Sequence, residues 1–127
     1  MRILKTASED KPLGYHMMLD CAGCLPESIR DQAVISEFLT KLVDAIGMTK
    51  LDEPIFKYGA EGEPWEGWSV IQFIETSAIT CHFLNPDNKA FIDVFSCKEF
   101  EPEIVAEHVK ATFSPSKCHV AFRHRDA

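Results

Sequence analysis

The sequence predicts an α+β fold: a two-layer sandwich in which one mostly antiparallel sheet carries two helices on a single face. Short apolar runs of strand length, with turn signals between them, follow the order strand, helix, several strands, helix, strand. The length of 127 residues and the apolar share of 46% suit one domain with its own core. Residues 1–13 are mixed and polar, so we expect an N-terminal arm there and a single domain at residues 14–127.

The first half of the chain is predicted to hold one strand and one helix. The largely apolar run Tyr15–Cys21 predicts a strand, which Gly23 and Pro26 bring to an end. Residues 28–46 carry apolar side chains three or four positions apart, and Gly47 follows them. This spacing predicts an amphipathic helix with a glycine stop at its C-terminus.

The second half of the chain is predicted to be mostly strands. Residues 102–113 predict a helix, because a proline stands in the first turn and the apolar side chains share one side. Residues 84–89 contain Asn-Pro-Asp-Asn and predict a turn, and the glycines and proline of residues 59–67 predict a loop. The predicted strands are residues 51–58, which Pro54 weakens, and residues 68–74, 78–83, 91–95 and 118–122.

Two helices on one face leave the other face of such a sheet without cover. Strand side chains alternate between the two faces, so apolar residues on the second face also need a partner. Self-association is the simplest way to supply one. We therefore expect a homodimer in which the two sheets pair.

Charge and hydropathy exclude several kinds of partner. Thirteen basic and twenty acidic side chains give a formal net charge of −7, whereas binding to a phosphate backbone needs a basic surface. The apolar runs are much shorter than a membrane span, and the N-terminus lacks the apolar core of a signal peptide. We expect a cytoplasmic protein that binds a small molecule and neither nucleic acid nor a membrane.

The five cysteines are an odd number, and we expect them to be reduced thiols. Cys21 and Cys24 form a CxxC motif. A zinc site would need a second CxxC or an HxxxH motif at a suitable spacing, and the sequence has neither. We therefore expect no metal, and interpret these cysteines as small buried thiols at the end of a strand.

Polar side chains on the apolar strands of residues 68–97 are candidates for a reactive site. Ser77 stands at the junction of two predicted strands, where a hydroxyl can lie close to the preceding carbonyl. We expect His82 and Cys97 to converge on it from neighbouring strands. A hydroxyl nucleophile with an imidazole for proton transfer is the chemistry that these residue types support.

The spacing of these residues resembles the small prokaryotic type of S-adenosylmethionine decarboxylase. That family has a serine, a self-processing serine eight residues later, a histidine five further on, and a cysteine fifteen beyond the histidine. The same spacing is met here by Ser69, Ser77, His82 and Cys97. Two further family patterns, Ile-Asp-Val-Phe-Thr-Cys and Gly-x-His-(apolar)-Asp-x-x-Gly-Cys, are matched by Ile92-Asp-Val-Phe-Ser-Cys97 and Gly14-Tyr-His-Met-Met-Leu-Asp-Cys-Ala-Gly-Cys24.

The resemblance implies an enzyme that makes its own pyruvoyl cofactor. Ser77 would attack the carbonyl of Thr76, and the chain would break before Ser77, which becomes the pyruvoyl group. By resemblance, His82 and Ser69 assist this step, and Cys97 returns a proton to the substrate after decarboxylation. The pyruvoyl carbonyl would accept the electrons left as CO2 departs from S-adenosylmethionine. The family also pairs its sheets in a dimer, and its product is the aminopropyl donor for spermidine synthesis.

Two residues are candidates for substrate binding: Trp65 can stack on an adenine, and Asp20 matches the N-terminal strand pattern of the family. Loop packing explains Trp65 equally well, and Asp20 is equally well explained as an acidic residue at the rim of the sheet. The sequence also departs from the family, which has Glu before the processing serine and usually His after it, where this chain has Thr76 and Ala78. Two alternatives therefore stay open: decarboxylation of ornithine or arginine, and an unprocessed, non-catalytic relative that acts as a binding or regulatory subunit.

Overall fold

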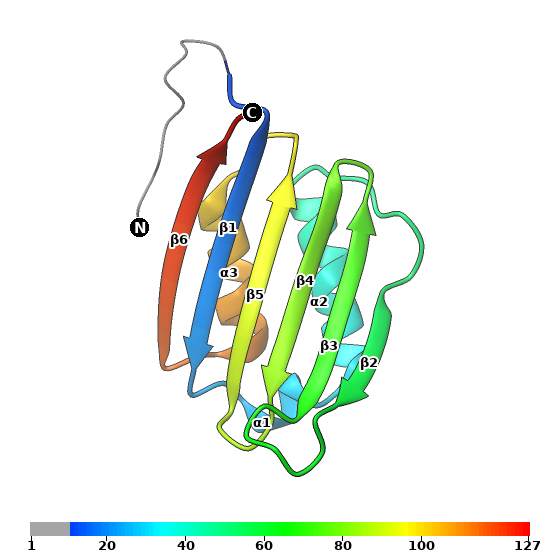
Figure 1. The fold of residues 1–127 in the computed structure, drawn as a ribbon, viewed down its shortest axis with the longest axis vertical. Helices are drawn as coiled ribbons and strands as arrows, with labels where there is room; N and C mark the ends of the chain where they lie inside the picture. Colours follow the sequence, from blue (N-terminus) through cyan, green and yellow to red (C-terminus); the bar gives the residue numbers. More distant parts are fainter. Residues whose placement is uncertain (1–10) are drawn as a thin grey trace.

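A computed structural model describes residues 11–127 as one six-stranded sheet with three helices behind it (Figure 1). Most of the predicted N-terminal arm, residues 1–10, lies outside the described residues. The strands are β1 (Gly14–Ala22), β2 (Ile55–Gly59), β3 (Gly67–Ile74), β4 (Ser77–Leu84), β5 (Lys89–Ser96) and β6 (Lys117–Arg125). The helices are α1 (Pro26–Ile29), α2 (Gln32–Ala45) and α3 (Pro102–Phe113).

The sheet has the strand order β2-β3-β4-β5-β1-β6, and all five neighbouring pairs are antiparallel. Figure 1 shows all the helices on one side of the sheet, which confirms the predicted two-layer architecture. None of the helices within residues 11–127 combines the length and the apolar character needed to span a membrane.

The long helix predicted over residues 28–46 is wrong in one respect, because the structure divides it at Arg30 and Asp31. The Asp31 carboxylate accepts hydrogen bonds from the N–H groups of Ala33 (2.8 Å) and Val34 (3.4 Å). This is an N-cap, so α2 begins after Asp31 and the preceding residues form the separate short α1. Residues 11–127 therefore contain three helices, where the sequence predicted two.

The core lies between the helices and one face of the sheet. Along β1, β3, β4 and β5, alternate residues such as Leu19, Ile79 and Ile92 are buried there, together with Leu39 and Val105 of the helices. The opposite face, which we call the open face, carries no helix. Its exposed apolar side chains are Met18, Ile55, Ile71, Phe73 and Phe91.

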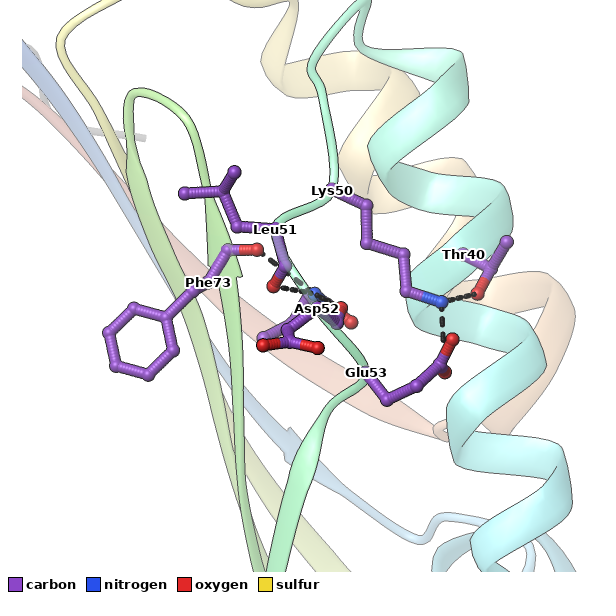
Figure 2. Close-up of polar contacts among 7 residues, drawn as sticks. Thr40, Lys50, Leu51, Asp52, Glu53 and Phe73 are labelled. Atoms are coloured by element: carbon purple, nitrogen blue, oxygen red, sulfur yellow. Dashed lines mark hydrogen bonds and ion pairs between the residues drawn. The ribbon is translucent and has the colours of Figure 1, made fainter.

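The segment between α2 and β2 runs along β3 and is tied to it (Figure 2). Leu51 N–H donates to the Phe73 carbonyl (2.9 Å), and the fully buried Gln72 amide donates to the Asp52 carbonyl (3.0 Å). Lys50 Nζ donates to Thr40 on α2 (3.1 Å). The strand predicted over residues 51–58 therefore begins only at Ile55, after the proline that cannot donate a ladder hydrogen bond.

Candidate active site

The bond between Thr76 and Ser77 lies where a tight turn joins β3 to β4. β3 ends at Ile74, which pairs with Ser77 across the hairpin. The Thr76 carbonyl oxygen accepts a hydrogen bond from the N–H of Cys97 (3.1 Å) at the end of β5. The structure therefore brings Cys97 next to the predicted cleavage bond, with a main-chain donor on the carbonyl that Ser77 would attack.

The five cysteines differ in how accessible their thiols are. Cys97 is exposed, whereas Cys21, Cys24 and Cys81 are buried. Burial raises the pKa of the Cys24 thiol to about 11 and also raises the pKa of Cys81, so both stay neutral near pH 7. Of these four thiols, only that of Cys97 is exposed.

A hollow of about 220 Å³ lies beside Cys97. The Phe95 ring forms part of its lining, and the Arg125 guanidinium carbon lies 4.9 Å from the centre of that ring. A Cβ atom at Gly14 would lie 2.9 Å from the Phe95 ring, so the glycine leaves room for the aromatic ring. The hollow is lined by Leu13, Gly14, Phe95, Cys97, Arg125, Asp126 and Ala127.

Ser69 and His82 form a pair on the open face, because they are register partners on β3 and β4. The Ser69 hydroxyl lies 2.7 Å from Nδ1 of His82, and Nε2 of His82 lies 3.0 Å from the Trp65 carbonyl oxygen. A carbonyl only accepts, so Nε2 carries the proton and Nδ1 of the neutral ring accepts from the Ser69 hydroxyl. The Trp65 carbonyl therefore fixes the tautomer of the neutral His82 ring.

His82 does not converge on Ser77 within the chain, which corrects the sequence-based expectation. Both residues belong to β4, and Ser77 is its first residue. Five residues of extended strand place His82 about 16 Å from Ser77. Five is also an odd number, so the two side chains point to opposite faces of the strand.

The two candidate substrate residues lie at the His82 end of the sheet. Trp65 is 53% exposed in the loop between β2 and β3, and its carbonyl, not its ring, contacts His82. Asp20 is exposed on the open face of β1. The strand register places Ser69, His82, Phe91 and Asp20 in one row across β3, β4, β5 and β1.

Comparison with known proteins identifies the family. A family model described as S-adenosylmethionine decarboxylase matches residues 15–126. The chain belongs to the S-adenosylmethionine decarboxylase family. It is 27% identical over 110 residues to the S-adenosylmethionine decarboxylase proenzyme of Pyrococcus furiosus, covering 86% of this chain and 76% of that protein. It is 26% identical over 108 residues to the proenzyme of the same name from Clostridium botulinum, covering 84% and 89% respectively.

A solved structure supports the fold of this family member. The crystal structure of the adenosylmethionine decarboxylase from Aquifex aeolicus matches with a TM-score of 0.77, covering 93% of this chain and 94% of that chain. The identity in this comparison is 20%, so it bears on the fold alone.

Sequence reasoning missed two features of this family member. His16 and Asp93 form a hydrogen-bonded pair on the open face, with 2.9 Å between Nε2 and Oδ1. Ser96, the residue before Cys97, is fully buried and bonds to Thr76. The alternation of side chains along β5 could have predicted that Ser96 lies on the buried face. Its contact with Thr76 could not be predicted in this way, because it depends on the register between strands.

Proposed function

We propose that this chain is a self-processing, pyruvoyl-dependent decarboxylase of S-adenosylmethionine that supplies the aminopropyl donor for spermidine synthesis. One observation carries the proposal: the Thr76–Ser77 bond lies in the β3–β4 turn of a member of this family, with its carbonyl bound by the Cys97 N–H. The names of the curated relatives, which include the word proenzyme, support cleavage and this substrate.

The cleavage begins at Ser77. Its Oγ attacks the Thr76 carbonyl carbon, and the negative charge that forms on the carbonyl oxygen faces the Cys97 N–H. The C–N bond then breaks, which leaves Thr76 joined to Ser77 Oγ as an ester. A base removes the Ser77 α-proton, and the Cβ–Oγ bond breaks to release the Thr76 carboxylate. Water then replaces the nitrogen of the resulting dehydroalanine, which leaves as ammonia, and the pyruvoyl group remains on the C-terminal fragment.

The surroundings of Ser77 fit a small carbonyl group. Ser77 is half-buried at the start of β4, and the exposed Cys97 follows its register partner Ser96. A pyruvoyl carbonyl supplies an electron sink for the pair left when CO2 departs. We assign to the Cys97 thiol the return of a proton to the substrate carbon, and to the hollow beside it the holding of substrate.

Proton transfer at Ser77 needs a base, and we assign His82 of a second copy of the chain. His82 and its partner Ser69 lie on the open face, among the exposed apolar side chains of that face. A two-fold axis perpendicular to the strands, lying between two open faces, places the His82 end of one chain over the Ser77 end of the other, so that His82 approaches the main chain of the Thr76–Ser77 turn from the side opposite to the Ser77 side chain. The homodimer then covers the apolar face and completes both sites.

The alternative functions receive less support. Decarboxylation of ornithine or arginine would use the same cleavage chemistry, but the family and its curated relatives are named for S-adenosylmethionine. A non-catalytic relative would keep the chain intact, and the departures at Thr76 and Ala78 are its basis.

The intact mass of the purified protein under denaturing conditions tests the proposal. We expect two fragments that separate before Ser77, with a pyruvoyl mass on the C-terminal one, and a single full-length species from Ser77→Ala. Release of CO2 should then occur with S-adenosylmethionine and not with ornithine or arginine. A single species near 14.3 kDa from the unaltered chain would overturn self-processing, and CO2 release from a basic amino acid alone would overturn the substrate.

A further inference from the structure

Ser96 is a fully buried hydroxyl residue at the end of β5, on the face that packs against the helices. Its Oγ lies 2.7 Å from Thr76 Oγ1 and accepts a hydrogen bond from Lys98 N–H (2.9 Å). The Met48 sulfur lies 3.7 Å from Ser96 Oγ and 3.4 Å from Thr76 Oγ1, so it accepts the remaining hydroxyl proton of the pair. Two of these three partners belong to the cleavage turn: Thr76 carries the carbonyl of the bond to be cut, and Lys98 follows Cys97, whose N–H binds that carbonyl.

We propose that Ser96 is a positioning residue for cleavage of the Thr76–Ser77 bond, an inference that rests on the proposed function. Ser96 does not itself donate to the scissile carbonyl; it acts through two neighbours. Its hydroxyl holds the side chain of Thr76, the residue whose carbonyl is attacked. By accepting from Lys98 N–H, it also fixes the turn that contains the Cys97 N–H.

These two hydrogen bonds lie on either side of the 3.1 Å contact between Cys97 N–H and the Thr76 carbonyl oxygen. The bond to Thr76 limits rotation of the residue that carries the accepting carbonyl. The bond from Lys98 limits rotation of the turn that carries the donating Cys97 N–H. A donor aimed in advance at a developing oxyanion stabilises the transition state, and loss of alignment by about 1 Å can slow a reaction about 100-fold. Ser96 thus acts on the geometry of the carbonyl before Ser77 attacks.

The hydroxyl of Thr76 has a defined role in this arrangement. A β-branched side chain has few rotamers, and the bond to Ser96 selects one of them. The resembled family has glutamate at this position and threonine at the position of Ser96. The pair of hydroxyls is therefore a way in which this chain holds the cleavage turn without a carboxylate.

The test compares cleavage rates after a pulse of cell-free synthesis, with fragments followed by mass. We expect Ser96→Ala and Thr76→Val each to slow cleavage roughly 10- to 100-fold. Because both variants break the same hydrogen bond, the double variant should be no slower than the slower single one. Ser96→Thr, which keeps the hydroxyl, should restore the rate to within about threefold of the unaltered chain.

Two matched controls separate positioning from general stability. Ser28→Ala removes a buried serine hydroxyl in α1, and Thr112→Val makes the same change as Thr76→Val at a half-buried site in α3. Both should cleave at the unaltered rate. If Ser96→Ala does not fold, Thr76→Val at the half-buried turn carries the test alone.

The outcomes distinguish this inference from the proposed function. Cleavage of Ser96→Ala or Thr76→Val at the unaltered rate would overturn the role of Ser96 while self-processing stands. Slowing that adds in the double variant, or equal slowing in the controls, would also overturn it. Failure of the unaltered chain to cleave would instead overturn the proposed function, and this inference with it.

Discussion

The two ends of β4 hold reactive groups in different ways. At the first end, the Thr76–Ser77 bond is held by the main chain of Cys97 and by the buried hydroxyl of Ser96. At the other end, the imidazole of His82 lies on the open face, with hydrogen bonds to Ser69 and to the Trp65 carbonyl. The first arrangement is directed inward, and the contacts that hold it are made within one chain. The second is directed outward, which is what a group that acts on a second copy of the chain requires.

The largest expected effect comes from separating the two ends in different chains. Alone, Ser77→Ala should not cleave, and His82→Ala should cleave at least about 100-fold more slowly than the unaltered chain, because it lacks the base. Co-expressed, the two variants should form a heterodimer that brings the Ser77 end of one chain against the His82 end of the other. Mass analysis should then find the His82→Ala chain cut and the Ser77→Ala chain intact. An uncut His82→Ala chain in a verified heterodimer would contradict action between chains.

An intermediate effect is expected when the thiol of Cys97 is removed but its N–H is kept. Cys97→Ala should still cleave, because the contact to the Thr76 carbonyl is made by the main chain. Its turnover of S-adenosylmethionine should fall about 100-fold, because the proton donor is lost. Both are measured on one preparation, by mass and by CO2 release. Unchanged turnover would remove the thiol from the reaction, and loss of cleavage would show that the side chain serves both steps.

The smallest effect is expected from shortening one apolar side chain on the open face, where His82 lies. Ile71 on the open face and Leu25 at the start of α1 are both 38% exposed. In a two-fold dimer Ile71→Ala removes apolar contact twice, at about 1 kcal/mol for each copy, so the dimer should dissociate about 30-fold more readily. Sedimentation over a range of concentrations measures this, with Leu25→Ala as the control. Equal behaviour of the two variants would place the interface elsewhere.

Most of the fold follows from local patterns in the sequence. The helix predicted over residues 102–113 has the same bounds in the structure, because a proline in the first turn and one apolar side define it locally. The break before α2 was missed, although Asp31 is a common N-cap residue, because the apolar spacing continues through it. A cap of this kind overrides periodicity.

The candidate site was predicted less completely than the fold. Spacing and resemblance selected Ser77, His82 and Cys97, but they did not say which of these lie together. The contact of Cys97 with Thr76 depends on the register of β4 against β5, which pairs residues far apart in the sequence. The separation of His82 from Ser77 could have been predicted from the sequence, since two strand residues an odd number of positions apart have their side chains on opposite faces. Their roles in catalysis stay predictions until the variants are measured.

The strand order has a consequence for the life of the protein after the cut. A break before Ser77 assigns β1, β2 and β3 to one fragment and β4, β5 and β6 to the other. In the sheet β1 lies between β5 and β6, and β3 pairs with β4, so three of the five strand pairings join the two fragments. A protein cut at this bond would be an interleaved pair of polypeptides that these three pairings hold together. Once unfolded, they must find each other in solution, so refolding becomes concentration-dependent, whereas the uncut chain folds alone. Under the proposed mechanism folding precedes cleavage, because the Cys97 N–H meets the Thr76 carbonyl only in the folded sheet, and the cut makes that order hard to reverse.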